Sequence, residues 1–231
     1  ARAVMAKDAG TCAGGKVTCA AMALAKEFPV TVRGYGMQLD NVDSIKDAFY
    51  QVKRDFGKLQ AFVANSANLG VGFDLLNTEE SDYDAIVDAN IKGTFFCCRE
   101  AAKLMLDSGG SIVTMGSVQG TGAVPGRAVY GMTKAALSQL VRSMAYELGQ
   151  YGIRANNIVA GAIHSSRWDD LSPEEIASRR SRYPAGREST EEEIANAVWF
   201  LCSEQSATIT GTDLTVDSGL SVCLLPYQKK E

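Results

Sequence analysis

Two residues on one predicted helix, Tyr130 and Lys134, have the types and the spacing to move a proton together. They stand four positions apart in a stretch of strong helical periodicity, so their side chains project from the same face. A neighbouring ammonium group favours ionisation of a phenol. To act as a general base near neutral pH, the phenol must lower its pKa from ~10 by about 3 units, which corresponds to roughly 4 kcal/mol. The pair is therefore a candidate for acid–base chemistry.

Ser117 adds a hydroxyl group at the end of a predicted strand. It follows the run Ser111–Met115 and precedes Tyr130 by thirteen residues, with a glycine-rich loop between them. Ligands of open α/β sheets bind at the carboxyl ends of the strands, where a hydroxyl can hydrogen-bond a substrate carbonyl. Each residue taken alone also has a structural interpretation: a half-buried tyrosine, a solvated lysine and a serine that caps a loop.

Together with Ser117, the run Tyr130-Gly-Met-Thr-Lys134 resembles the catalytic signature of the short-chain dehydrogenase/reductase family. The resemblance covers the chain from about Gln38 to Gly219, and it includes these further runs: Asp88-Ala-Asn90-Ile-Lys-Gly-Thr, Pro184-Ala-Gly-Arg187, Glu193-Ile-Ala and Ile209-Thr-Gly-Thr-Asp-Leu-Thr-Val-Asp-Ser-Gly219. It implies an α/β fold with a doubly wound, Rossmann-like parallel sheet in a single domain, residues 1–231, with a substrate lid at about residues 163–183. The implied activity is hydride transfer between NAD or NADP and a secondary alcohol or ketone.

The resemblance also implies a role for each candidate catalytic residue. Tyr130 exchanges a proton with the substrate oxygen, while Ser117 holds and polarises that oxygen. Lys134 binds the nicotinamide ribose and lowers the pKa of the tyrosine, and Asn90 holds a water that relays protons to the lysine. The cofactor contacts that it implies are Gln38, Leu39, Asn65, Ser66, Ala67, Tyr130, Lys134, Gly161, Ile163 and Ser165.

Several positions depart from the family pattern. The run Ala64-Asn65-Ser66-Ala67 replaces the usual Asn-Asn-Ala-Gly, Gln38 replaces an aspartate, and Ala160-Gly161 replaces Pro-Gly, with Ser165 in place of threonine. The glycine turn that cradles the pyrophosphate is not matched by Gly14-Gly15. We expect that the first strand, this turn and the second strand belong to the protein but are missing before Ala1 and near the Gly10–Thr11 junction, with a spatial break there. The choice between NAD and NADP is therefore not predicted.

Hydrophobic patterning predicts the elements that position these residues. Short apolar or β-branched runs predict parallel strands at Leu59–Ala64, Ser111–Met115, Arg154–Val159 and Asp213–Val216. Helical periodicity predicts helices at Ser44–Phe56, Ser81–Leu106, Ala128–Tyr151 and Thr190–Ser203, and earlier at Ala1–Gly10 and Thr11–Phe28. Ser44 and Thr190 each precede an acidic residue by three positions, which predicts two helix N-caps.

Composition narrows the classes of function. The 231 residues are 46% hydrophobic, and the net charge of -4 provides no basic surface for nucleic acid. No apolar run is long enough to span a membrane and no signal peptide is evident, so we expect a soluble, cytoplasmic protein. The six cysteines form neither a CxxC pair nor a metal-type cluster, so we expect reduced thiols and no metal site. The single histidine, His164, and the missing GxSxG motif argue against a serine hydrolase.

The substrate and the partners stay open at this point. The short, polar lid favours a sugar, sugar acid or other polyol over a 3-oxoacyl thioester on a carrier protein, while steroid and xenobiotic ketones also remain. Arg179, Arg180 and Arg182 form either a solvated helix face or a site for an anionic substrate. A non-catalytic binding module with the same fold is the alternative from another class.

We further expect a homotetramer, or at least a homodimer. Family members that resemble this chain pair through the two long helices that correspond to Ser81–Leu106 and Ala128–Tyr151. Apolar residues on more than one face of these helices support such an assembly: Phe95, Phe96, Leu137, Leu140 and Met144.

Overall fold

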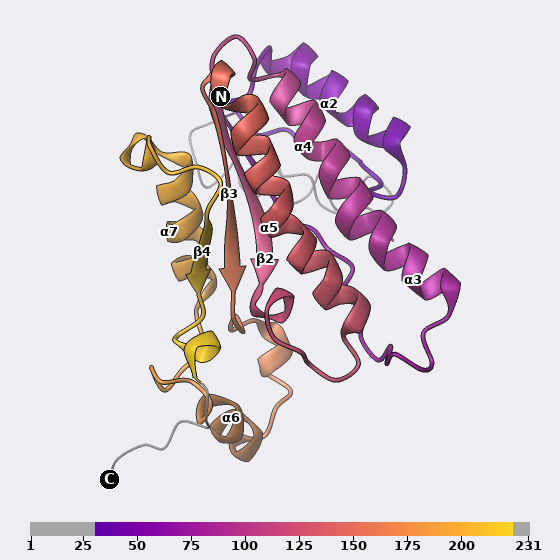
Figure 1. The fold of residues 1–231 in the computed structure, drawn as a ribbon, viewed down its shortest axis with the longest axis vertical. Coiled ribbons are helices and arrows are strands. Elements are labelled where there is room, and N and C mark those ends of the chain that lie inside the picture. The colour runs from indigo at the N-terminus through magenta and orange to yellow at the C-terminus, as the bar shows by residue number, and fades with distance from the viewer. Residues whose placement is uncertain (1–30, 224–231) are drawn as a thin grey trace.

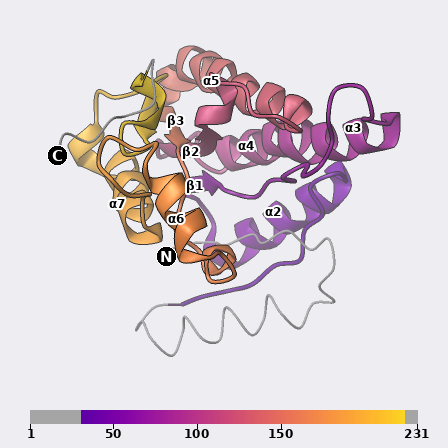
Figure 2. The same ribbon diagram turned by 90° about the horizontal axis from the view of Figure 1, so that it is seen from below.

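The computed structural model describes residues 31–223 and contains a parallel sheet of four strands. The strands lie in chain order (Figure 1 and Figure 2): β1 (Ala61–Ala64), β2 (Gly110–Ser117), β3 (Ile153–Ala160) and β4 (Asp213–Val216). All four predicted strands are confirmed, and β2 and β3 are longer at both ends than their apolar runs. The expected helices at Ala1–Gly10 and Thr11–Phe28, and the expected break between Gly10 and Thr11, lie outside the described residues.

Helices cover both faces of the sheet, because successive side chains of the central strands point to opposite faces. Ile112 of β2 belongs to one buried cluster, which it shares with side chains of α2 (Val42–Phe56), α4 (Thr94–Lys103) and α5 (Ala128–Leu148). The next residue, Val113, belongs to the other cluster, which α7 (Glu191–Cys202) covers. The view from below shows α7 and α5 on opposite sides of the strands (Figure 2). The predicted doubly wound α/β arrangement is confirmed.

The long helix predicted at Ser81–Leu106 is interrupted by a wider turn. It consists of α3 (Glu80–Val87), a π-helical turn (Asp88–Gly93) and α4. A π-helical turn inserts one extra residue into the helix and occurs often at functional sites. This turn contains Asn90, a candidate site residue, and a periodicity of 3.6 residues in the sequence does not reveal it.

One predicted helix cap is wrong and the other is confirmed. Helix α2 begins after Asn41, whose side chain accepts hydrogen bonds from the N–H groups of Asp43 and Ser44. Ser44 is therefore inside the helix, and its hydroxyl accepts a hydrogen bond from the N–H of Gln38 instead. Thr190 forms the expected capping box at the start of α7.

The remaining elements are short. Helix α6 (Pro173–Arg180) and a 3-10 turn (Ser166–Trp168) lie in the expected lid. Further 3-10 turns follow β2 (Val118–Gly120), α5 (Gly149–Tyr151), α7 (Glu204–Ser206) and β4 (Leu220–Val222). No helix in the described part of the chain is long and apolar enough to cross a membrane. The four cysteines in that part are free thiols, and burial raises the pKa of Cys97 to about 12.

Candidate active site

The candidate residues emerge at one edge of the sheet, where the parallel strands end. Ser117, the last residue of β2, pairs with Ala160, the last residue of β3. The last residue of β1, Ala64, pairs with Thr114, which lies three residues before Ser117 on β2. The segments that follow these strands therefore leave the sheet on the same side. Open α/β sheets bind their ligands at this edge.

The loop after β2 is seated directly on α5. The Ser117 hydroxyl accepts a hydrogen bond from the N–H of Gln119 at 3.2 Å, which turns the chain immediately after the strand. A Cβ atom on Gly120 would lie 2.9 Å from the Ala135 nitrogen, and one on Gly131 would lie 2.7 Å from the Gln119 carbonyl oxygen. Only glycine permits contacts this close, so these two residues fix the position of Ser117 relative to the first turns of α5.

Lys134 is buried behind the loop, with 5% of its surface exposed. Its Nζ donates a hydrogen bond to the Met115 carbonyl oxygen at 2.6 Å, and this bond joins α5 to β2. Burial lowers the pKa of Lys134 to about 8, because desolvation disfavours the ammonium form. A lysine with such a pKa still carries most of its charge at neutral pH, yet it loses and regains a proton readily.

Tyr130 is buried one turn before Lys134. Two cations lie near its ring: Lys134 Nζ is 5.5 Å from the ring centroid and the Arg127 guanidinium carbon is 5.8 Å from it. Arg127 also donates a hydrogen bond to the Leu69 carbonyl oxygen. The sequence did not single out Arg127, which stands three positions before Tyr130 and immediately before α5. The two cations favour the ionised form of a nearby phenol.

Asn90 links the loop after β1 to α5. Its side chain is buried and makes two bonds with the backbone of Asn68: Oδ1 accepts from the N–H at 2.7 Å, and Nδ2 donates to the carbonyl oxygen at 2.9 Å. Nδ2 also donates to Thr133 Oγ1 at 3.0 Å, and this hydroxyl donates to the Tyr130 carbonyl oxygen. The four candidate catalytic residues are thus brought to one edge of the sheet, and Asn68 and Thr133 are positioning residues that the sequence did not reveal.

The residues expected to contact a cofactor fall into two groups. Gly161, Ile163 and Ser165 follow β3 directly and lie at the same edge as Ser117. The hydroxyl oxygen of Ser165 is buried and has no hydrogen-bond partner among the described residues. Gly161 packs against Asp217, and Ile163 pairs with Ser189, which gives both of them a structural role as well.

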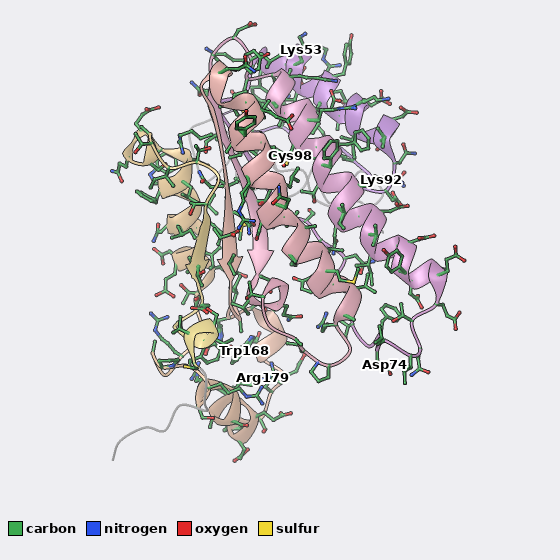
Figure 3. All side chains as sticks on the ribbon, in the orientation of Figure 1. Lys53, Asp74, Lys92, Cys98, Trp168 and Arg179 are labelled. Atoms are coloured by element: carbon green, nitrogen blue, oxygen red, sulfur yellow. The ribbon has the colours of Figure 1, made fainter. Side chains whose placement is uncertain are left out.

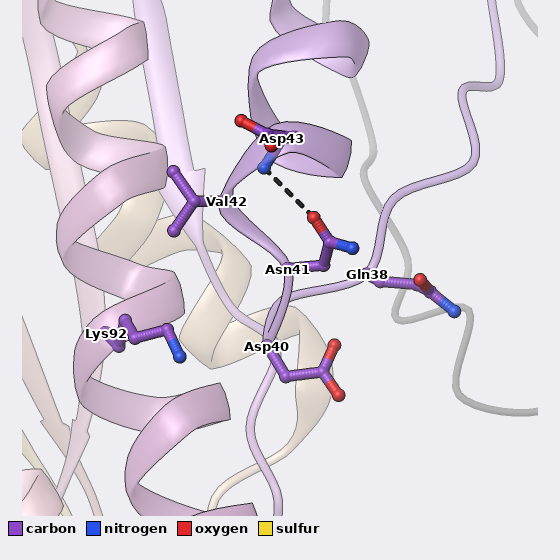
Figure 4. A pocket seen from close by; sticks show the side chains of 6 residues that line it. All are labelled: Gln38, Asp40, Asn41, Val42, Asp43 and Lys92. Atoms are coloured by element: carbon purple, nitrogen blue, oxygen red, sulfur yellow. Dashed lines mark hydrogen bonds between the residues drawn. The ribbon is translucent and has the colours of Figure 1, made fainter.

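The second group precedes or follows β1. Asn65 is exposed, and Ser66 and Ala67 are half-buried, in the loop after β1. The Leu39 side chain lies in the hydrophobic core, so only its backbone can face a ligand. Gln38 is exposed and lines a shallow pocket of about 410 Å³ at the start of α2 (Figure 4). None of the four candidate catalytic residues lines this pocket.

Comparison with known proteins identifies the chain. A sequence model of a protein family, described as enoyl-(acyl carrier protein) reductase, matches residues 6–221 of this chain. A 2-(S)-hydroxypropyl-CoM dehydrogenase of Xanthobacter autotrophicus is 34% identical to this chain in an alignment that covers 82% of the chain and 76% of the relative. The chain belongs to the short-chain dehydrogenase/reductase family. As a member of this family, it is an oxidoreductase that depends on NAD or NADP.

Other relatives in the short-chain dehydrogenase/reductase family differ in substrate. A 3-oxoacyl-acyl-carrier-protein reductase of Staphylococcus aureus is 34% identical over 78% of this chain and 73% of its own length. The crystal structure of a candidate gluconate dehydrogenase from Agrobacterium tumefaciens has a TM-score of 0.85 at 27% identity, and covers 92% of this chain and 85% of that one. The substrate therefore has to be inferred from this chain's own residues.

The segment expected to form the lid in this short-chain dehydrogenase/reductase is held by a buried carboxylate. Glu188 is 4% exposed and receives two hydrogen bonds from Arg180, at 2.7 and 2.8 Å. His164 Nδ1 lies 2.8 Å from the same carboxylate. These bonds, above all those from Arg180, lower the pKa of Glu188 to about 2. Arg180 thus holds α6 to the chain that enters α7, a role that its place in a basic cluster did not indicate.

The outer side of the lid remains charged. Trp168 is buried, and the Arg179 guanidinium carbon lies 5.4 Å from the centroid of its ring (Figure 3). Arg179 and Arg182 are exposed, as the solvated-face interpretation expected. Tyr183, at the end of the lid, is buried as well.

A buried polar network behind the site was also missed. Asn157 of β3 accepts a hydrogen bond from Thr114 of β2 at 2.8 Å and donates one to Asp213 of β4 at 2.7 Å. Asp213 in turn accepts from Ser138 and Arg142 of α5. These bonds fix α5 across three neighbouring strands. An asparagine within an apolar run was the signal in the sequence, but only the packed strands bring its partners together.

Proposed function

We propose that this protein oxidises a secondary alcohol, or reduces the corresponding ketone, in a small polar substrate such as a sugar, sugar acid or other polyol. The observation that carries the proposal is the arrangement of Ser117, Tyr130 and Lys134 at the carboxyl edge of the sheet. This edge also carries the unpaired Ser165 hydroxyl, which suits the amide of a nicotinamide ring.

In the proposed mechanism, Ser117 donates its hydroxyl hydrogen to the substrate oxygen, while one of its two lone pairs accepts the bond from the Gln119 N–H. Tyr130 gives a proton to that oxygen during reduction and takes it back during oxidation. Lys134 stabilises the phenolate by its charge, and a pKa of about 8 suits it to restore the proton. The nicotinamide cofactor, when bound, supplies or accepts the hydride. Asn90 is proposed to orient the water that connects Lys134 to solvent.

Two properties of the lid support a small hydrophilic substrate. Its large apolar side chains, Trp168 and Tyr183, are buried and so do not line a channel for an acyl chain. Its exposed positions include Asp169, Asp170 and Arg179, which favour hydroxyl or carboxylate groups over hydrocarbon. The likeness to a candidate gluconate dehydrogenase points the same way.

Reduction of a 3-oxoacyl thioester is the second candidate, since 3-oxoacyl-acyl-carrier-protein reductases are 34% identical to this chain. A screen of polyols, sugar acids and acetoacetyl-CoA, each with both nicotinamide cofactors, separates the two. We expect turnover of at least one sugar acid or polyol at a kcat/KM at least tenfold above that for the thioester. The opposite ratio would contradict the proposal. Tight cofactor binding without any turnover would favour a non-catalytic module. One relative, from Xanthobacter autotrophicus, is itself named an inactive 2-(S)-hydroxypropyl-CoM dehydrogenase, and it is 34% identical over 88% of this chain.

We also propose that the protein assembles as a homotetramer or homodimer through α4 and α5. Two of the residues expected to support this, Leu137 and Met144, are buried inside the fold and cannot contribute to an interface. Phe95, from the same expected set, is exposed on these helices, as are Met132 and Tyr146, which the sequence did not single out. Light scattering should give at least twice the monomer mass at micromolar concentration, and a monomer would contradict the proposal. The cytoplasmic location stays a prediction.

A further inference from the structure

An arginine beside the candidate proton donor has no carboxylate partner among the described residues. The guanidinium carbon of Arg127 lies 5.8 Å from the centroid of the Tyr130 ring, and no acidic side chain of the described chain pairs with it. Other arginines in that part of the chain do pair with carboxylates: Arg54, Arg99, Arg142, Arg180 and Arg187. Arg127 is half-buried, so a solute can reach it while its charge is partly withdrawn from water. Such a charge is stabilised by an anion, and the described chain supplies none here.

The guanidinium group is held in place by one hydrogen bond and keeps other donors. It donates to the carbonyl oxygen of Leu69, in the loop after β1, and the Arg127 backbone forms an isolated bridge with Phe73 of the same loop. A guanidinium group carries several N–H donors in a planar fork, and no further hydrogen bond within the described residues engages them. A fork that is anchored at one nitrogen and open at the others matches the two oxygens of a carboxylate.

The start of α5 adds positive potential at the same place. Arg127 is the last residue before the helix, its side chain does not cap the helix, and the first turn contains no acidic residue. The first N–H groups of a helix carry a partial positive charge, which attracts anions. Helix α7, by contrast, offsets this charge with three glutamates in its first turn. Tyr130 lies in the first turn of α5, so the positive region and the reacting group lie together.

We propose that Arg127 is a specificity-determining residue that binds an anionic group of the substrate, which is the carboxylate in the case of a sugar acid. The inference rests on the proposed function, because it requires a substrate whose alcohol or ketone reacts at Tyr130. It narrows that function from sugars, sugar acids and polyols to the acids. Since the guanidinium carbon lies 5.8 Å from the ring centroid, a molecule of a few carbons can contact both groups. A neutral polyol offers a CH2OH group in place of the carboxylate and leaves the arginine without a counter-ion.

Pairs of compounds that differ only in this group test the proposal, each a sugar acid and the polyol with CH2OH in place of its carboxylate: gluconate and glucitol, galactonate and galactitol, mannonate and mannitol. Their kcat/KM values are measured with wild-type protein, Arg127→Gln and Arg127→Lys, using NAD and NADP. Lys53→Gln is the control for the loss of one positive charge. Lys53 is exposed near the end of α2, which leads into the amino end of β1, at the opposite edge of the sheet (Figure 3).

The readout is the ratio of kcat/KM for the acid to kcat/KM for the polyol of the same pair. We expect this ratio to be roughly 10 to 100 for wild-type protein. Arg127→Gln, which keeps an N–H donor without the charge, should reduce it to within about threefold of unity. Any effect of the lost charge on the ionisation of Tyr130 acts on both members of a pair and cancels in the ratio. Arg127→Lys keeps the charge without the planar fork and should give an intermediate ratio, while the control should retain the wild-type ratio.

Two results overturn the role of Arg127 and leave the proposed function intact. One is wild-type protein that uses the polyols at least as well as the acids. The other is Arg127→Gln that slows both members of a pair by the same factor and shifts the pH profile of kcat/KM for both, which would show that the arginine acts only on Tyr130. Melting temperatures show that each variant is folded, and Arg127→Lys provides the test if Arg127→Gln does not fold. Failure of the proposed function has a different signature: wild-type protein that reduces acetoacetyl-CoA and turns over none of the sugar acids and polyols overturns both.

Discussion

The loop and helix around Ser117 and the lid around Glu188 follow neighbouring strands, but different kinds of interaction hold them. Ser117 is positioned by glycine contacts, by the hydrogen bond from the Gln119 N–H, and by the bond from Lys134 of α5 to the Met115 carbonyl of β2. The lid is tied down by a buried carboxylate with an arginine and a histidine that are both partly exposed. Close packing fixes the positions of atoms tightly. An ion pair whose basic partner is partly exposed tolerates small changes in geometry.

This difference suggests a division of labour. Proton transfer requires the Tyr130 oxygen at a fixed place, and a misplacement of about 1 Å can reduce a rate by 100-fold. Substrate recognition requires a segment that adapts, and charged side chains at half-exposed positions can be changed at small cost in stability. We therefore expect changes in the loop and helix to lower kcat, and changes around Glu188 to raise KM.

The largest effect should come from Tyr130→Phe. This change removes the hydroxyl and keeps the buried ring, so kcat should fall by more than about 1000-fold, or roughly 4 kcal/mol, with cofactor affinity nearly unchanged. Steady-state kinetics and cofactor titration measure the two quantities. Tyr50→Phe on α2 is the control, because Tyr50 is 69% exposed, and it should leave kcat unchanged. If Tyr130→Phe keeps a tenth of the wild-type kcat, Tyr130 is not the proton donor.

Lys134→Met tests whether the buried ammonium group costs stability. The folded pKa of Lys134 is about 8, below the value of 10.5 for an unperturbed lysine, so the folded state disfavours the charged form. Wild-type stability relative to the variant should be lowest below pH 8 and should rise by about 3 kcal/mol as the pH increases from 8 to 10.5. Urea unfolding of both proteins without cofactor measures this difference. A difference that does not vary with pH would show that the lysine is not desolvated in solution.

Gly120→Ala tests the close contact between the loop and α5. Its added methyl group would lie 2.9 Å from the Ala135 nitrogen, so we expect a loss of about 2 kcal/mol in unfolding free energy and a lower kcat. Gly149→Ala is the matched control, since nothing lies within 4 Å of its added Cβ and its φ of -56° is helical. That control should be neutral or stabilising by up to about 1 kcal/mol. Equal effects from both changes would contradict a specific contact at Gly120.

The smallest effect is expected from Glu188→Gln. The neutral amide weakens the pairing with Arg180, which is partly exposed, so unfolding free energy should fall by about 1 kcal/mol while KM rises several-fold at constant kcat. The folded pKa of Glu188 is about 2, below the ordinary 4.5, so its stabilising effect is present above pH 4.5 and is lost as the pH falls toward 2. Glu188→Gln should therefore not show the loss of unfolding free energy that protonation of Glu188 causes in the wild type as the pH falls from 4.5 toward 2. Glu174→Gln, on the exposed side of α6, should behave like the wild type, and a large loss of kcat in Glu188→Gln would contradict the division of labour.

Local patterns sufficed for several predictions. Buried parallel strands and amphipathic helices have periods that depend only on neighbouring residues, so the four strands and the positions of Ser117, Tyr130 and Lys134 were predictable. The cap at Ser44 was wrong because two nearby side chains, Asn41 and Ser44, can serve as caps, and only the path of the chain before α2 decides between them. The π-helical turn around Asn90 was missed because a single inserted residue barely changes the hydrophobic pattern.

The sequence by itself determined the fold class, the family and the residues that are equipped for proton transfer, because those depend on residue type and on spacing along one element. The tertiary structure alone decided how these residues are held and which groups surround them. Arg127 bonds the Leu69 carbonyl, Asn90 bonds Asn68, and Glu188 bonds Arg180 and His164, through contacts that span eight to fifty-eight positions of the chain. Side chains become buried only when distant segments pack together and exclude water. This burial lowers the pKa of Lys134 and leaves the Gln119 oxygen without a hydrogen-bond partner among the described residues.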